Sequence, residues 1–194
     1  MHTFGIRVLG ALAIVVAGVA GVGHSASATG PDLLAGHGNF EKPAESGLGA
    51  TFAPGAVFDG WTVSTAKVAL FRAVGSVITP PQGNQGLSLT DAFAPPSQTA
   101  GTVCRVVPTI TGHRYSIPFQ AAIADTGTGD IVVKLGTTSK TVALPLGTQP
   151  AVFKRYQPTV RAAATRARFC MTATKLTGNA YPAVDAVKVI DLGP

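Results

Sequence analysis

Hydrophobic and polar residues alternate with a period of two through most of the chain, which is typical of strands with one buried face. The alternation is clearest in residues 87–91, 115–123 and 167–174. Outside the N-terminal segment, no window sustains the 3.6-residue apolar period of a helix. Turn signals recur about every 8 to 12 residues. The pattern predicts an all-β chain folded as an antiparallel β-sandwich of the jelly-roll kind.

About ten strands are expected, joined by turns rich in Gly, Pro, Asn and Asp. The first begins at residues 39–41, and the others span 58–64, 67–72, 87–91, 102–107, 115–123, 131–135, 140–144, 152–160, 167–174 and 184–190. We expect a hairpin around residues 136–139, a loop at 43–54 and a polar turn at 125–130. The motifs at 38–41 and 182–189 suggest that the first and last strands lie side by side.

Trp61, the single tryptophan of the chain, lies between a turn-forming Asp-Gly pair and an alternating Thr-Val pair. A large ring pointing inward at this place would anchor a core between two sheets. The other aromatic residues expected in this core are Phe40, Tyr115, Phe119 and Phe169.

The N-terminal residues 1–28 have the pattern of a secretory signal peptide. Arg7 supplies a basic region, residues 8–22 are apolar, and Ala26-Ser27-Ala28 is a small-x-small cleavage site. A membrane anchor is the alternative, but the apolar run of about 15 residues is shorter than the roughly 20 needed to cross a bilayer. We therefore expect a secreted protein, with residues 29–194 as one domain and no membrane contact after cleavage.

Two cysteines, Cys104 and Cys170, both fall in strand-like runs. In an exported chain such a pair is expected to form a disulfide, the alternative being two buried thiols. Two cysteines and the two histidines outside the signal segment do not suffice for a structural zinc site.

The formal net charge is +6, and the cations are unevenly distributed. Residues 131–184 contain no acidic residue. The cations of that stretch are Lys134, Lys140, Lys154, Arg155, Arg161, Arg166, Arg168 and Lys175. Gathered on one face they would attract polyanions, and otherwise they form a solvated surface. Nucleic acid is not an expected partner, because aromatic residues are not interleaved with these cations.

Catalytic motifs are weak in this chain. His37 and His113 are each flanked by Gly, neither is close in sequence to a plausible nucleophile, and no Gly-x-Ser-x-Gly elbow is present. Asp125-Thr126-Gly127 matches the aspartic protease motif, but that chemistry needs two such carboxylates, which only a homodimer could supply. The same residues have the composition of a hairpin turn, and we do not expect an enzyme.

Five blocks in order resemble the DUF642 and choice-of-anchor C group of galactose-binding-like jelly rolls. The blocks are residues 39–41, 60–63, 81–89, 112–115 with Phe119, and 182–189. The resemblance covers nearly all of residues 29–194 and implies an extracellular or cell-wall-associated domain that binds carbohydrate without catalysis. The chain departs from the group at Cys104-Arg105, where a Gln-containing strand is common, and in lacking a second Trp.

Glu41 and Asp185 stand at opposite ends of the domain sequence. Related sugar-binding jelly rolls often hold a structural calcium where the first and last strands meet, so the resemblance implies that these carboxylates and nearby backbone carbonyls bind calcium. The alternative is that both are surface acids or salt-bridge partners.

Carbohydrate recognition combines aromatic rings that stack on sugars with polar side chains that bind hydroxyls. The expected ligand-binding residues are Phe71, Tyr156 and Tyr181, with Arg105, Gln149 and Arg155 as polar partners. The expected function is therefore a secreted, non-catalytic carbohydrate-binding or cell-wall-binding domain, with an acidic polysaccharide favoured by the basic stretch. A secreted structural or protein-interaction module without a sugar site is the alternative.

Overall fold

The structure, a computed structural model, describes residues 30–73, 77–93 and 99–194. The predicted signal peptide, residues 1–28, lies outside the described residues. Within the described part of the chain, no helix is long and apolar enough to cross a membrane.

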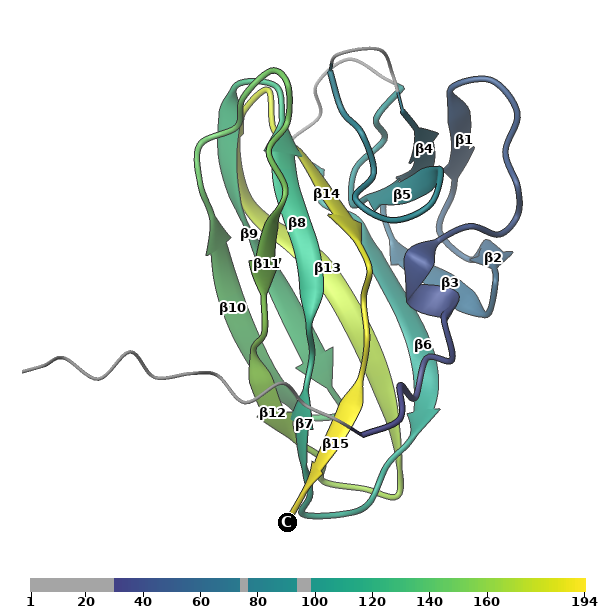
Figure 1. Cartoon of the computed structure of the whole chain (residues 1–194), viewed down its shortest axis with the longest axis vertical. Coiled ribbons are helices and arrows are strands. Elements are labelled where there is room, and N and C mark those ends of the chain that lie inside the picture. The colour runs from purple at the N-terminus through teal and green to yellow at the C-terminus, as the bar shows by residue number, and fades with distance from the viewer. Residues whose placement is uncertain (1–29, 74–76, 94–98) are drawn as a thin grey trace, which may run out of the picture.

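The described residues fold into two packed antiparallel layers (Figure 1). The back sheet has the order β10-β9-β13-β6-β3-β2, and the front sheet has the order β1-β4-β5-β14-β8-β11. An end sheet, β12-β7-β15, continues the front layer toward the C-terminus. Consecutive strands repeatedly cross from one layer to the other. The predicted antiparallel β-sandwich of the jelly-roll class is confirmed.

The helix and strand bounds are η1 His37–Asn39, β1 Gly49–Phe52, β2 Val57–Phe58, β3 Trp61–Thr65, β4 Val68–Arg72, β5 Gln85–Ser88, β6 Thr102–Pro108, β7 Arg114–Ser116, β8 Phe119–Ala124, β9 Gly127–Leu135, β10 Thr138–Leu144, β11 Lys154–Tyr156, β12 Thr159–Arg161, β13 Arg166–Gly178, β14 Tyr181–Asp185 and β15 Ile190–Gly193.

The longest strands follow the period-two pattern most closely. Buried and more exposed positions alternate along β9 and along β13 from Arg166 to Thr174, because one face of each packs on the core. The predicted hairpin between β9 and β10 is confirmed, with Leu135 opposite Thr138 and a two-residue turn in which Gly136 has φ 62°. Gly suits this turn because it adopts positive φ without steric cost.

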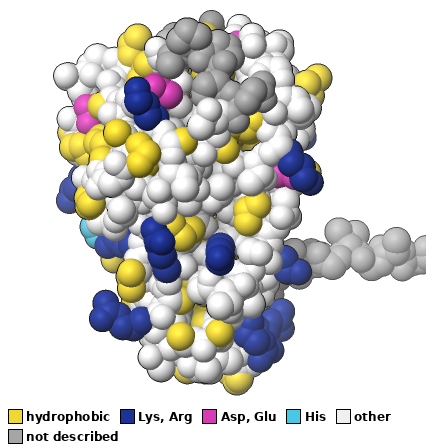
Figure 2. All heavy atoms as spheres, turned by 180° about the vertical axis from the view of Figure 1, so that it is seen from behind, with side chains coloured by type: hydrophobic (Ala, Val, Ile, Leu, Met, Phe, Trp, Pro, Cys, Tyr) yellow, Lys and Arg dark blue, Asp and Glu magenta, His cyan; other side chains and the backbone are white. Residues whose placement is uncertain are grey.

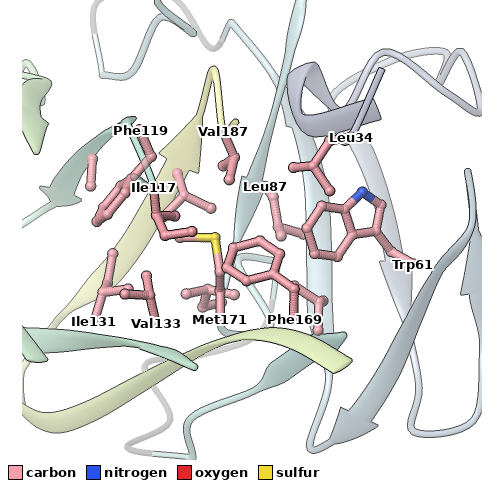
Figure 3. Packing of buried hydrophobic residues seen from close by; sticks show 14 of the residues in the cluster. Leu34, Trp61, Leu87, Ile117, Phe119, Ile131, Val133, Phe169, Met171 and Val187 are labelled. Atoms are coloured by element: carbon pink, nitrogen blue, oxygen red, sulfur yellow. The ribbon is translucent and has the colours of Figure 1, made fainter. Parts of the chain in front are cut away.

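The core between the layers contains all five predicted aromatic residues, each no more than 1% exposed. Figure 3 shows the Trp61 indole beside Leu87 and Phe169. The Trp61 and Phe169 ring centroids lie 5.8 Å apart in an edge-to-face arrangement. The indole Nε1–H donates to the His37 carbonyl at 2.9 Å, so its polar atom is satisfied.

Cys104 on β6 and Cys170 on β13 are directly opposite in register and form a disulfide. The predicted pairing is confirmed. The bond joins two adjacent central strands of the back sheet, which closes a long segment of chain.

The expected strand 58–64 is broken by the Asp59-Gly60 turn into β2 and β3. Three more expected strands, 115–123, 152–160 and 184–190, are each broken in two where the front and end sheets meet. Pro118 and Pro158 stand at two of the breaks, where a residue without an N–H cannot continue the ladder. At the third, Ala186 adopts φ 52° and turns the chain out of β14. These interruptions separate the front sheet from the end sheet, so the prediction of single continuous strands was wrong.

The expected first strand was also wrong. Residues 37–39 form a 3-10 helix and Phe40 has φ 55°, so no strand begins at 39–41. The segment still runs beside the C-terminal segment, as expected of the first strand. The Leu33 N–H donates to the Val189 carbonyl at 2.8 Å, and the Val187 N–H donates to the Gly38 carbonyl at 3.0 Å.

Two expected connections contain strand residues. β1 lies inside the loop expected at 43–54 and pairs with β4 at the edge of the front sheet. β9 begins at Gly127, so the turn expected at 125–130 is shorter than predicted. The composition of both segments is typical of turns, and long-range pairing overrides it.

Candidate functional site

An apolar cleft of about 280 Å³ opens on the outer face of the front sheet. Its lining residues are Leu48, Phe71, Val77, Ile78, Ser88, Ala92, Phe93, Ala124, Asp125, Gln149, Tyr181 and Ala183. The strands place alternate side chains here. Leu70 and Val184 belong to the main core, whereas their neighbours Phe71 and Ala183 belong to a second, smaller cluster.

Three aromatic rings sit at different depths in this apolar cleft. Phe71 is 3% exposed and covers the backbone of Gly86, where an added Cβ would come within 2.6 Å of the ring. Tyr181 is half-buried, and Phe93 at the rim is 44% exposed. A ligand entering the cleft would therefore meet Phe93 and Tyr181 before the floor at Phe71.

The polar groups of the apolar cleft are few and carry no positive charge. Asp125 has φ 68°, and its carboxylate accepts the Thr126 N–H at 2.7 Å. Gln149 is exposed at the opening. Burial raises the pKa of the Tyr181 hydroxyl, and the nearby Asp125 and Asp91 carboxylates raise it further. The negative potential and the absence of Lys or Arg among the described lining residues disfavour an anion in this cleft.

The structure brings three of the six expected ligand residues, Phe71, Gln149 and Tyr181, into this cleft. Phe71 lies on β4, Gln149 in the chain before β11, and Tyr181 on β14, so the three are far apart in sequence. Their role in binding stays a prediction.

The other three expected ligand residues lie elsewhere. The Tyr156 ring stacks on Phe119 with centroids 5.5 Å apart, so it packs against the core. The Arg105 guanidinium donates to the Asp59 carbonyl at 2.5 Å. Arg155, on the edge strand β11, lines a separate hollow with Lys188.

Several residues of the apolar cleft were not predicted from the sequence. The composition around Asp125 predicts a turn, which is correct, but it does not indicate that this residue lines the apolar cleft. Leu48 and Ile78 carry no local signal, because only the fold brings their loops over the front sheet. Phe93, an aromatic residue in a segment without strand pattern, is the one that could have been noticed.

The two acids expected to bind calcium converge on the loop at 82–85. Asp185 accepts the Gln82 N–H at 2.8 Å and the Ala186 N–H at 2.6 Å. Glu41 accepts the N–H groups of Asn84 and Gln85 at 2.9 and 3.0 Å. The segments that carry the acids are thus joined through one loop, and calcium binding stays a prediction.

The Asp185 carboxyl is fully buried. Burial raises its pKa to about 7, and the Glu41 carboxylate adds to the rise, although the Gln82 and Ala186 amides lower it. Phe40 and Ala186, the neighbours of the two acids, both have positive φ, which is uncommon for residues with a side chain. The backbone is therefore turned sharply at both acids.

The ligand type of the acid pair, two carboxylates, suits a hard cation. Carboxylate oxygens are ligands that calcium prefers, and a positive ion would offset both the burial and the mutual repulsion of the pair. Gly83 permits the close approach, because a Cβ there would lie 2.1 Å from the Glu41 carboxylate. Among the described residues no group of three or more His, Cys, Asp or Glu could hold a metal, so further ligands would have to be backbone or amide oxygens.

Each histidine of the described chain is bonded to an aspartate. His37 lies 2.7 Å from Asp59, and His113 lies 3.0 Å from Asp191. No serine hydroxyl of the described residues is bonded to either ring. The first pair joins η1 to the turn between β2 and β3, the second joins the segment before β7 to β15, and neither lines the apolar cleft.

The cations of the acid-free stretch are spread over both layers. Lys154 and Arg155 lie on β11 of the front sheet, whereas Arg166 and Arg168 lie on β13 of the back sheet. Figure 2 shows the face behind that of Figure 1, with Lys and Arg side chains in both halves, more of them in the lower half, and acidic side chains in the upper half. The basic character thus belongs to one end of the sandwich more than to one face.

No protein-family model matches the chain, and no curated protein matches it. Solved structures similar to it include TmCBM61 in complex with beta-1,4-galactotriose, at 15% identity and a TM-score of 0.48 over 68% of this chain and 88% of that one. A family 35 carbohydrate-binding module from an environmental isolate has 14% identity and a TM-score of 0.48 over 74% and 94%.

The enzymatically active domain of bacteriophage CBA120 tailspike protein 4 has 15% identity and a TM-score of 0.49 over 69% of this chain. This chain spans only 19% of the tailspike chain. All three TM-scores are below 0.5.

Proposed function

We propose that the chain is a carbohydrate-binding domain and that the apolar cleft is its glycan site. One observation carries the proposal: the aromatic residues Phe71, Phe93 and Tyr181 line one cleft together with a few polar residues, Ser88, Asp125 and Gln149. Small-ligand sites have this composition, with apolar walls and a few polar groups that orient the ligand.

The chemistry matches a pyranose ring. The C–H face of a sugar packs on aromatic rings, and Tyr181 and Phe93 offer such surfaces at the opening. The Asp125 carboxylate can accept hydrogen bonds from two hydroxyls, and the Gln149 amide can both donate and accept. Because Asp125 is negative, we propose a neutral sugar residue in the apolar cleft. The acidic part of a polysaccharide would have to bind elsewhere on the domain.

The cleft is suited to binding rather than hydrolysis. Glycoside hydrolysis uses two carboxyl groups on opposite sides of the scissile bond. Asp125 is the sole carboxylate among the described lining residues. The proposed function is therefore non-catalytic.

We also propose that the protein acts outside the cell, on wall or extracellular polysaccharide. The Cys104–Cys170 disulfide supports this, because disulfides persist in oxidising compartments. A structural calcium held by Glu41 and Asp185 is part of the same proposal. It would stabilise the loop at 82–85, which leads directly into β5 beneath the cleft.

The test is titration calorimetry of the domain with a panel of neutral oligosaccharides of different linkage. Tyr181→Ala should weaken the best binder by about tenfold or more, about 1.4 kcal/mol, through loss of the stacking surface. Asp125→Asn should weaken it by a smaller factor. The matched control is Asp130→Asn, since Asp130 pairs with Lys175 and does not line the cleft.

Absence of binding to every sugar in the panel would contradict the proposal. So would binding that survives both cleft variants. Exposed apolar residues at the rim, Leu48 and Phe93, would then favour the alternative, a protein-interaction module.

A further inference from the structure

A basic hollow of about 540 Å³ lies between β7, β10 and β12. Its lining residues are Arg114, Thr138, Ser139, Lys140, Thr159, Val160 and Arg161. Figure 1 places β7 and β12 at the lower end of the sandwich and β4 and β5, which form part of the apolar cleft, at the upper end. The two sites therefore lie at opposite ends of the molecule.

Two arginines of the basic hollow face one another. Arg161 on β12 is directly opposite Arg114 on β7 in the antiparallel register. Like charges at directly opposite positions destabilise a sheet. Such a pair indicates a site that favours a negative partner.

The cations of the basic hollow have no described acidic partner. Elsewhere, Lys67 lies 3.6 Å from Asp91 and Lys175 lies 3.0 Å from Asp130. Among the described residues, no carboxylate lies within ion-pair distance of Arg114, Lys140 or Arg161, and none lines the hollow. The positive charge is therefore uncompensated within this part of the chain.

The nearest acid along the end sheet is already engaged. Asp191 on β15 is opposite Tyr115, one residue from Arg114. Its carboxylate accepts hydrogen bonds from the Tyr115 hydroxyl at 3.2 Å and the Gly193 N–H at 2.7 Å, and lies 3.0 Å from His113. It is thus held by three groups and leaves Arg114 to an outside partner.

The basic hollow is held in shape by its own hydrogen bonds. The Thr138 hydroxyl donates to the Arg161 carbonyl and ties β10 to β12. The Arg161 Nη1–H donates to the Gly112 carbonyl at 2.8 Å, which fixes the guanidinium while its other N–H groups stay available. Ser139 and Thr159 add hydroxyls beside the cations. A planar guanidinium fork with neighbouring hydroxyl donors suits a carboxylate or phosphate oxygen pair.

We propose that the basic hollow binds the anionic groups of an acidic polysaccharide, either uronate carboxylates or backbone phosphates. The choice of a polysaccharide rests on the proposed carbohydrate binding, whereas the anion recognition rests on the hollow alone. With a neutral sugar in the apolar cleft and an oxyanion in the basic hollow, the domain binds two different parts of one polymer or two neighbouring chains.

The experiment measures binding of oligogalacturonate, poly(glycerol phosphate) and a neutral oligosaccharide panel to the disulfide-bonded domain, by calorimetry and by thermal shift. One or both anionic polymers should bind and raise the unfolding midpoint, and which one binds identifies the anion. Arg114→Gln and Arg161→Gln should each weaken this binding by about two- to fivefold, and the double variant by more. Raising the salt from 0.05 to 0.5 M should weaken it further.

Two controls separate this proposal from the cleft and from net charge. Arg166→Gln removes one positive charge from an exposed position of β13 outside the hollow, and it should weaken binding less than Arg114→Gln. Tyr181→Ala should leave anion binding unchanged. Neutral sugars that fail to bind while the anions bind through the arginines would refute the cleft and leave the hollow standing.

The proposal is overturned if neither anionic polymer binds, or if Arg166→Gln weakens binding as much as the hollow variants do. A DNA duplex bound as tightly as the glycans would overturn the choice of a polysaccharide.

Discussion

The two ends of the sandwich are built from the same layers but present opposite chemistry. At one end, the apolar cleft combines three aromatic rings with the Asp125 carboxylate and no described cation. At the other, the basic hollow combines Arg114, Lys140 and Arg161 with hydroxyls and no described acid. A ligand that suits one end is disfavoured at the other.

The difference arises where the front layer is interrupted. Pro118, Pro158 and Ala186 lie at nearly the same level and divide the layer into the front sheet and the end sheet. Isolated backbone hydrogen bonds connect the strands at this interruption. In one of them the Ile117 N–H donates to the Pro158 carbonyl at 2.9 Å. Each end therefore has its own sheet and its own outward-facing residues. The acid pair Glu41 and Asp185 lies where β14 ends, between the two.

The largest expected effect tests whether the two ends of the sandwich unfold as one cooperative unit. The disulfide lies in the back sheet, which supports both ends, and it closes a loop of 66 residues. Its removal, by Cys104→Ala with Cys170→Ala, should lower the free energy of unfolding by about 4 kcal/mol under the chain-entropy model. Urea denaturation measures the change. If the ends form one cooperative unit, anion binding and neutral-sugar binding should be lost together along the denaturation curve. Loss at clearly different urea concentrations would show that the ends unfold separately.

The next effect concerns the acid pair between the ends. If Glu41 and Asp185 hold calcium, saturating calcium at about 100 times its Kd should stabilise the fold by about 2.7 kcal/mol relative to chelator. Differential scanning calorimetry in calcium and in chelator measures this, and Glu41→Gln should abolish the difference. Equal midpoints in both buffers would leave the two acids as loop-fastening groups.

A pH-dependent effect, spread over about three pH units, is expected in chelator. The pKa of Asp185 is raised to about 7, so between about pH 4 and 7 the folded chain keeps a proton that the unfolded chain releases. Stability from this group is full below about pH 4 and should fall as the pH rises, at about 1.4 kcal/mol per pH unit, until it levels off above pH 7. Asp185→Asn should flatten the profile of unfolding free energy against pH. A wild-type profile that does not fall between pH 5 and 7 would refute the raised pKa.

The smallest expected effect tests the repulsion between the two arginines at the basic end. Arg114→Gln relieves the repulsion with Arg161, so in low salt without anion it should raise the free energy of unfolding by a few tenths of a kcal/mol. Arg166→Gln, which has Pro108 opposite it, should not raise it. A loss of stability in Arg114→Gln would mean that the two arginines are compensated by a contact other than a bound anion.

Local patterns in the sequence determined the class of the fold. Period-two runs require strands with one buried face, and Trp61 with its four aromatic partners predicted the core that forms. The pairing of Cys104 with Cys170 followed from their number and from the expected export. Glu41 and Asp185 were placed together by the resemblance of the chain ends to known jelly rolls, and the loop at 82–85 joins them.

Only the tertiary structure decided where the surface sites lie, because strand pairing joins residues that are distant in sequence. Phe71, Gln149 and Tyr181 share the apolar cleft, while Arg105, Arg155 and Tyr156, which were expected to bind with them, fall outside it. Nothing near Arg114 indicates that Arg161 lies opposite. A shift of register by one residue would turn each of these side chains to the other face, so the two ends are defined by non-local hydrogen bonding that no local pattern encodes.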